Sequence, residues 1–147
     1  MTRGIFDGLL SLLAPRWCEG CGEPLRAGET PDAGFLCGDC RSSLRRVPAP
    51  HCTVCFRTSG AEVCPDCAKR RHAFSACAAG GLYEGLLARL VHKLKYRGKA
   101  HLARDMADLI AEAAAGCGGT RLVDGLAYVP MTFKSERERG YNHASLI

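Results

Sequence analysis

Eight of the ten cysteines fall into four Cys-x-x-Cys pairs, and this spacing is the feature of the sequence that most directly implies chemistry. The pairs are Cys18 and Cys21, Cys37 and Cys40, Cys52 and Cys55, and Cys64 and Cys67. Two intervening residues let the chain turn so that both sulfurs reach one metal ion at about 2.3 Å, while backbone amides point at the thiolates. Because four thiolates complete a tetrahedral zinc site, the pattern predicts two zinc ions with eight ligands.

Each Cys-x-x-Cys pair is called a knuckle here. Loop lengths favour a site in which each knuckle shares its metal ion with the next knuckle along the chain. In this arrangement, the loop from Cys21 to Cys37 and the loop from Cys55 to Cys64 have lengths typical of zinc ribbons. An interleaved arrangement would cost about a kcal/mol more chain entropy. His51 stands beside Cys52 and is an alternative ligand. With four thiols already available, we interpret it as a surface histidine.

A closed four-thiolate site has no open position for activating water, so the predicted metal is structural. Few large apolar side chains occur between residues 18 and 67, and metal binding worth about 10 kcal/mol replaces the missing core. Iron is the alternative metal. Redox dithiols are disfavoured because the motifs occur in tandem. The two cysteines outside the array are predicted to be a small core residue in a strand, Cys77, and a loop residue, Cys117.

The formal net charge of +5 does not by itself indicate a nucleic-acid partner. Eight thiolates subtract eight charges and two zinc ions add four, which brings the charge to +1. No stretch is long enough to span a bilayer, and no convincing secretory leader is present, so a reducing cytoplasm is expected. Residues 1–17 are predicted to form an amphipathic helix that docks on the protein's own body rather than on a membrane surface.

Composition changes after the basic residues 69–72, which predicts a domain boundary there. The predicted units are the helix at 1–17, a double zinc ribbon at 18–71 and an α/β domain at 72–147. Within the last unit, 74–83 is expected to be a buried strand, 84–95 and 102–115 helices, and 126–129 another strand. The second helix is expected to turn Leu102, Met106, Leu109 and Ile110 inward. Strand, helix, helix and strand in this order suggest a parallel sheet.

Two basic clusters lie in the second half, at residues 92–99 and 134–142. The second cluster follows a predicted strand, and ligands of open α/β sheets bind beyond the carboxyl ends of strands. Arg137 and Arg139 are therefore candidates for phosphate contacts. The alternative is a solvated helix face on which Glu136 and Glu138 neutralise these arginines.

Taken together, the sequence resembles the ComF family, which carries a double zinc ribbon ahead of a type I phosphoribosyltransferase domain. Three blocks match in order: the four knuckles; residues 83–98, with the run His92-Lys93-Leu94-Lys95-Tyr96-Arg97-Gly98; and Val129-Pro130 followed by Arg137-Glu138-Arg139-Gly140-Tyr141-Asn142. The resemblance implies use of phosphoribosyl pyrophosphate with Mg²⁺ and a link to DNA uptake and competence. By resemblance, Lys95, Arg97, Arg137 and Arg139 would contact phosphates, whereas no catalytic residue is assigned.

The sequence also departs from the family pattern. Thr132-Phe133 stands where the family has His-Pro, His143 replaces a glutamine, and the later acidic pair with its ribose-phosphate loop is not found. The expectation is therefore an incomplete parallel sheet, truncated at the C-terminus, and a chain inactive alone. Two further hypotheses stay open. In the first, the ribbon is a binding module whose partner is single-stranded DNA or a protein of the DNA-uptake machinery. The contacts would then come from the basic residues that flank the knuckles, which are Arg41, Arg45, Arg46, Lys69, Arg70 and Arg71. In the second, the ribbon is a purely structural element.

Overall fold

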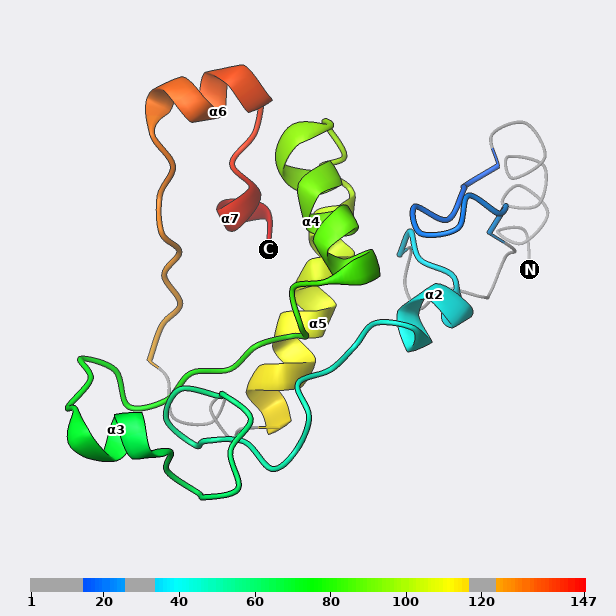
Figure 1. Ribbon diagram of the computed structural model, residues 1–147. Helices are drawn as coiled ribbons and strands as arrows, with labels where there is room; N and C mark the ends of the chain where they lie inside the picture. The colour runs from blue at the N-terminus through cyan, green and yellow to red at the C-terminus, as the bar shows by residue number, and fades with distance from the viewer. Residues whose placement is uncertain (1–14, 26–33, 117–123) are drawn as a thin grey trace.

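A computed structural model describes residues 15–25, 34–116 and 124–147 of the chain (Figure 1). The helices in these ranges are α2 Gly38–Ser42, α3 Pro65–Lys69, α4 Gly85–Tyr96, α5 Leu102–Gly116, α6 Phe133–Arg139 and α7 His143–Leu146. The predicted N-terminal helix up to residue 14, and Cys117, lie outside the described residues.

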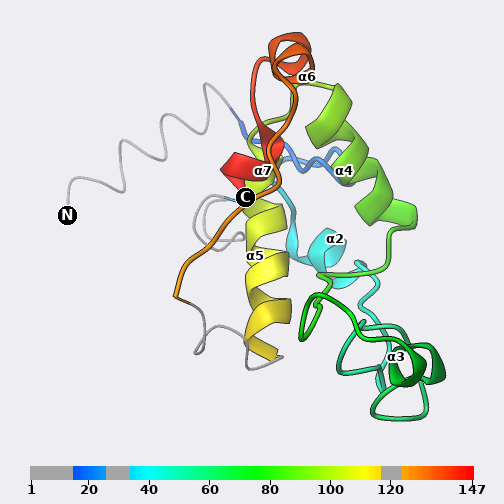
Figure 2. The ribbon, with the colours of Figure 1, turned by 90° about the vertical axis from the view of Figure 1, so that its left-hand side faces the viewer.

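The helices α4 and α5 form the centre of the molecule and pack side by side in both views (Figures 1 and 2). Their bounds confirm the two helices predicted from apolar spacing, to within one residue at each end. Gly98 follows α4 with a φ of 67°, a left-handed conformation that glycine adopts without steric cost and that ends the helix.

Apolar side chains on the facing sides of the two helices make the core. Leu90 and Leu102 are fully buried, and Met106 and Leu109 are nearly so. Ile110 was expected to point inward but is 51% exposed. Its position, one residue after Leu109, turns it about 100° away from the face that meets α4.

The segment that carries the first four-cysteine group, called the first ribbon below, shares this core. Cys18, Leu36 and Leu44 belong to the same buried cluster as Leu90 and Leu102. The ribbon residues and the helices therefore bury apolar surface against each other. The predicted domain boundary near residue 72 separates segments that pack together in the folded chain.

The two strands predicted in the second half are not formed, and no β-strand occurs in the described residues. Residues 74–79 are exposed along their length, including Cys77, which is not a core residue. In the segment 126–129, Leu126 is 96% and Val129 is 83% exposed. A strand is stable only when a neighbouring segment completes its hydrogen-bond ladder, and no described segment does so here. The parallel sheet is thus absent from the described chain.

Residues 125–132 form an extended segment that leads to α6, which lies at the opposite end of the molecule from the C-terminal end of α5 in Figure 2. Thr132 caps α6 by accepting a hydrogen bond at its Oγ1 atom from the Ser135 amide at 3.3 Å. After α6, Tyr141 donates a hydrogen bond from its hydroxyl to the Leu94 carbonyl, and α7 packs on α5. None of the helices in the described ranges is both long and apolar enough to cross a membrane.

Candidate metal centres

The eight knuckle cysteines gather into two groups of four. Within each group, the sulfurs all lie within 4.8 Å of one another. The groups join the knuckles in sequential order, as the loop lengths favour: Cys18, Cys21, Cys37 and Cys40 in the first, and Cys52, Cys55, Cys64 and Cys67 in the second. His51 is not in either group, and its ring packs on Phe56 with centroids 4.0 Å apart.

The spacing of the sulfurs fits a metal ion and does not fit disulfides. Between knuckles, Cys21 Sγ lies 3.8 Å from Cys37 Sγ, and Cys55 Sγ lies 3.8 Å from Cys64 Sγ. A disulfide requires about 2.05 Å. A tetrahedron whose corners lie about 2.3 Å from its centre has edges of about 3.8 Å, which is the zinc–thiolate geometry. Each group could therefore hold one metal ion.

Both centres are built on the same local plan, which makes them an internal structural repeat. In each, the first knuckle is enclosed by an antiparallel bridge, Trp17 with Pro24 and His51 with Thr58. The cysteine that opens it donates its amide to a carbonyl five residues on, at 2.8 Å in both centres. Sequence reasoning missed this repeat, although the equal Cys-x-x-Cys turns were its signal.

The second knuckle of each centre begins a short helix. Cys37 is the N-cap of α2 and Cys64 is the N-cap of α3. Their amides donate to the opening cysteine of the same centre, Cys37 N to Cys18 Sγ at 3.3 Å and Cys64 N to Cys52 Sγ at 3.3 Å. Helix N-termini favour negative charge, so this arrangement suits thiolates.

The pKa values of the thiols diverge within each centre. Burial acts to raise the pKa of Cys18, but amide hydrogen bonds from Cys37, Cys21 and Gly20 outweigh it and bring the value to about 6. The amides of Cys64 and Cys55 are the main cause that lowers the pKa of Cys52 to about 6. Burial, then the neighbouring thiols, raise the pKa of Cys67 to about 12. Four crowded thiolates repel one another, and a divalent cation relieves that repulsion.

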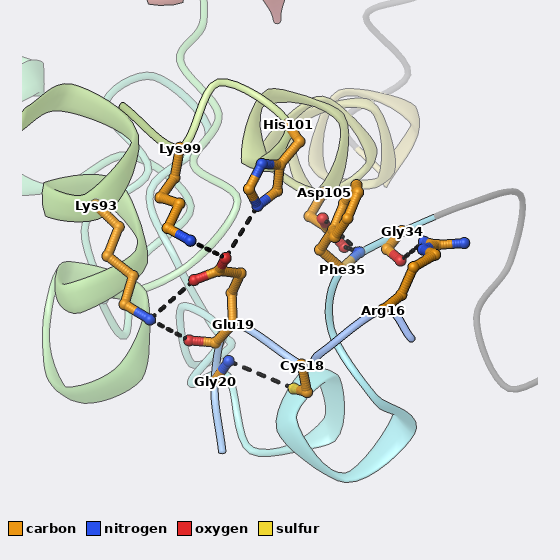
Figure 3. Close-up of polar contacts among 10 residues, drawn as sticks. All are labelled: Arg16, Cys18, Glu19, Gly20, Gly34, Phe35, Lys93, Lys99, His101 and Asp105. Atoms are coloured by element: carbon orange, nitrogen blue, oxygen red, sulfur yellow. Dashed lines mark hydrogen bonds and ion pairs between the residues drawn. The ribbon is translucent and has the colours of Figure 1, made fainter. Parts of the chain in front are cut away.

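The first centre is tied to the helices by polar contacts as well as by its apolar core (Figure 3). Asp105 on α5 is 1% exposed, and its two carboxylate oxygens accept from the Phe35 amide at 3.2 and 3.0 Å. Burial raises the pKa of Asp105, and the Phe35 hydrogen bond opposes that rise. Arg41, at the end of α2, pairs with Glu112 at 2.5 Å and Asp108 at 3.5 Å on α5.

Of the residues expected to contact phosphate, the structure brings only Lys95 and Arg139 together. Both line a pocket of about 350 Å³ with Tyr96 and Tyr141. The Arg139 guanidinium lies 5.0 Å from the centre of the Tyr96 ring. Arg97 lines a different pocket, along α4, and Arg137 is exposed on α6.

The basic residues that flank the knuckles divide into two sets. Arg41 and Arg46 both pair with Glu112, and Arg45 pairs with Glu84 at 2.5 Å. These three guanidinium groups already have carboxylate partners. Residues 69–71 are exposed.

The chain matches no family model, no curated protein and no solved structure.

Proposed function

We propose that the chain is a zinc-stabilised protein of the ComF type, in which two structural zinc ions organise the front of a phosphoribosyltransferase-like domain. The observation that carries the metal part is the sulfur geometry of the two four-cysteine groups. The observation that favours a scaffolding role is the shared core, in which Leu36 and Leu44 of the first ribbon pack with α4 and α5.

Zinc is the metal that best fits four thiolates at tetrahedral spacing. When bound, it supplies a closed structural crosslink. The protein's own residues then orient the ligands through amide hydrogen bonds at Cys18 and Cys52. Such thiols must stay reduced before metal binds, which favours a reducing compartment such as the cytoplasm.

Metal content tests this part directly. Protein purified under reducing conditions is expected to contain roughly two zinc ions per chain, measured by atomic emission. A value near zero in a folded, reduced sample would remove the metal proposal, and iron in place of zinc would correct the metal alone.

The second part of the proposal is that phosphoribosyl pyrophosphate is the ligand and that the protein is linked to DNA uptake. Its support is the motif resemblance together with the convergence of Lys95 and Arg139 on one pocket. Two cations beside Tyr96 and Tyr141 suit a phosphorylated ring-bearing ligand, whereas the Glu138 carboxylate, which also lines the pocket, opposes a phosphate. Arg137 and Arg97 do not line this pocket and have weaker support.

One measurement tests the proposal that phosphoribosyl pyrophosphate is the ligand. Isothermal titration of phosphoribosyl pyrophosphate with Mg²⁺ is expected to give no measurable heat with these 147 residues alone, because the resemblance implies a further loop for the ribose phosphate. Measurable binding would overturn that expected inactivity.

The alternative function is binding of single-stranded DNA or a DNA-uptake partner by the ribbon. The exposed run at 69–71 favours it, whereas the ion pairs of Arg41, Arg45 and Arg46 weigh against their part in it. Replacing Lys69, Arg70 and Arg71 with alanine should lower affinity for a single strand and flatten its salt dependence. Affinity unchanged in both respects would dismiss this function for the ribbon.

A further inference from the structure

A pocket of about 720 Å³ runs along α4 and the turn that follows it. Four of its seven lining residues are lysines or arginines: Arg89, Lys93, Arg97 and Lys99. No carboxylate of the described residues lines it. The volume lies within the range of small-ligand pockets. The pocket is wide open to solvent and its exposed lining is mostly apolar, so the four cations act on an anion from around an apolar surface.

The arrangement of these cations on α4 is unfavourable without a partner. Arg89, Lys93 and Arg97 follow at intervals of four residues and share one face, where like charges repel. The helix dipole favours cations near the C-terminus of α4, which accounts for Lys93 and Arg97. Arg89 lies in the first half of the helix, where the dipole gives no such compensation.

Two of the four cations, Lys93 and Lys99, share the single Glu19 carboxylate of the first knuckle, which offsets one of their two positive charges (Figure 3). Lys93 Nζ lies 3.0 Å from Glu19 Oε2 and also donates to the Glu19 carbonyl at 2.7 Å. Lys99 Nζ lies 2.9 Å from Glu19 Oε1, and His101 Nε2 is 3.1 Å from the same oxygen. The Glu19 side chain is only 12% exposed, so this carboxylate faces the lysines rather than solvent.

Arg89 and Arg97 differ from the two lysines in their ion pairing. Neither belongs to an ion pair within the described ranges. A guanidinium group presents a planar fork of donors that matches phosphate oxygens. Tyr83 also lines the pocket and is 70% exposed, which leaves an aromatic face available for stacking.

We propose that this pocket binds a nucleotide-class ligand, with Arg89 and Arg97 on phosphate and Tyr83 against the base, and that Glu19 sets the pocket's charge by holding Lys93 and Lys99. The site is distinct from the pocket of Lys95 and Arg139, and the inference does not depend on the family resemblance. A free nucleotide and a nucleotide within a single strand present the same chemistry.

Fluorescence anisotropy of the zinc-loaded full chain tests this proposal. The probes are a fluorescent ADP and a fluorescein-labelled decathymidylate. Replacing both Arg89 and Arg97 with alanine should weaken binding by about tenfold or more, since each loses charged hydrogen bonds. The control replaces Arg104 and Lys134 with alanine, which removes the same charge from exposed positions outside the pocket and should change affinity by less than about twofold.

The two probes also separate the two sources of ligand. Binding of ADP alone identifies a free nucleotide, and much tighter binding of decathymidylate identifies a single strand. If neither probe binds, or if the pocket and control variants weaken binding equally, the proposal is overturned.

A second set of variants tests the role of Glu19 in the opposite direction. Glu19→Gln should release Lys99 and raise affinity several-fold, with a salt dependence for decathymidylate that steepens by roughly 0.7 for each new phosphate contact. Lys99→Ala alone should have little effect but should cancel most of the gain in a Glu19→Gln background. Unchanged affinity in a Glu19→Gln protein that keeps both zinc ions and its helical content contradicts the role of Glu19.

Discussion

The two metal centres share one local plan but differ in what surrounds them. The first contributes Cys18, Leu36 and Leu44 to the hydrophobic core, and its backbone is tied to α5 through Asp105. The second contributes no residue to that core. Its backbone hydrogen bonds stay within its own loop, such as Thr53 to Glu62 at 2.8 Å.

The same metal crosslink would therefore play a different structural role in each centre. In the first centre, metal binding fixes a surface against which α4 and α5 pack, so metal and core stabilise each other. In the second centre, metal binding fixes a loop that adds no residue to that core, so we expect its folding to contribute less to the rest. In both views α3 lies at one end of the molecule, away from α6 (Figures 1 and 2).

Removing one ligand from each centre gives the largest expected contrast. Cys18→Ser should abolish the first metal site and unfold much of the α4–α5 pair, because metal binding worth about 10 kcal/mol is coupled to that core. Cys52→Ser should lose one zinc ion and leave most of the helical signal. Zinc per chain and circular dichroism at 222 nm measure the two effects. An equal loss of helix signal in both variants would show that the second centre is equally integrated.

Apolar truncation should repeat the contrast on a smaller scale. Leu36 is 3% exposed and belongs to the core, whereas Val63 is 39% exposed beside the second centre. Leu36→Ala is expected to lower the free energy of unfolding by about 2–5 kcal/mol, and Val63→Ala by less than about 1 kcal/mol. Urea unfolding at a fixed excess of zinc measures both, and a cost for Val63→Ala as large as that for Leu36→Ala would place the second ribbon in the cooperative core.

The sequence predicted best what local spacing determines. Cys-x-x-Cys turns predicted the two sulfur groups, and leucines at helical spacing predicted α4 and α5 with their ends. Both depend on residues close together along the chain. Leu102, Met106 and Leu109 needed only an apolar stripe to be predicted to turn inward, and all three are buried.

Predictions that depended on distant partners did less well. Apolar runs at 74–83 and 126–129 have strand-like composition, but a strand needs a neighbour that the composition does not supply. The polar contacts from the first ribbon to the helices were also missed. Glu19 and Lys93 are separated by 74 residues, and nothing local to either residue identifies the other.

Asp105 offers the next contrast, between the charge of a buried group and its hydrogen bond. Asp105→Ala leaves the Phe35 amide buried without an acceptor and should cost about 1–3 kcal/mol. Asp105→Asn keeps an acceptor of the same shape and removes a charge whose burial raises the pKa of the carboxyl. Its cost should therefore be clearly smaller in urea unfolding at neutral pH. If the two variants were equally destabilised, the charge itself, through Arg41, would be the stabilising feature.

The smallest expected effect comes from one turn position that the two centres fill differently. Gly22 has a φ of 82° in the first knuckle, and Phe56 holds the equivalent place in the second with a φ of 61°. An added Cβ at Gly22 meets no atom within 4 Å, so Gly22→Ala pays only the backbone cost of a left-handed residue, about 1 kcal/mol. Gly38→Ala is the matched control, because that position is equally open and has no positive φ, and it should be neutral or slightly stabilising.

Both variants should keep two zinc ions, since Phe56 shows that this turn accepts a side chain. Loss of zinc on Gly22→Ala would mean that the first turn, unlike the second, requires glycine for its metal site.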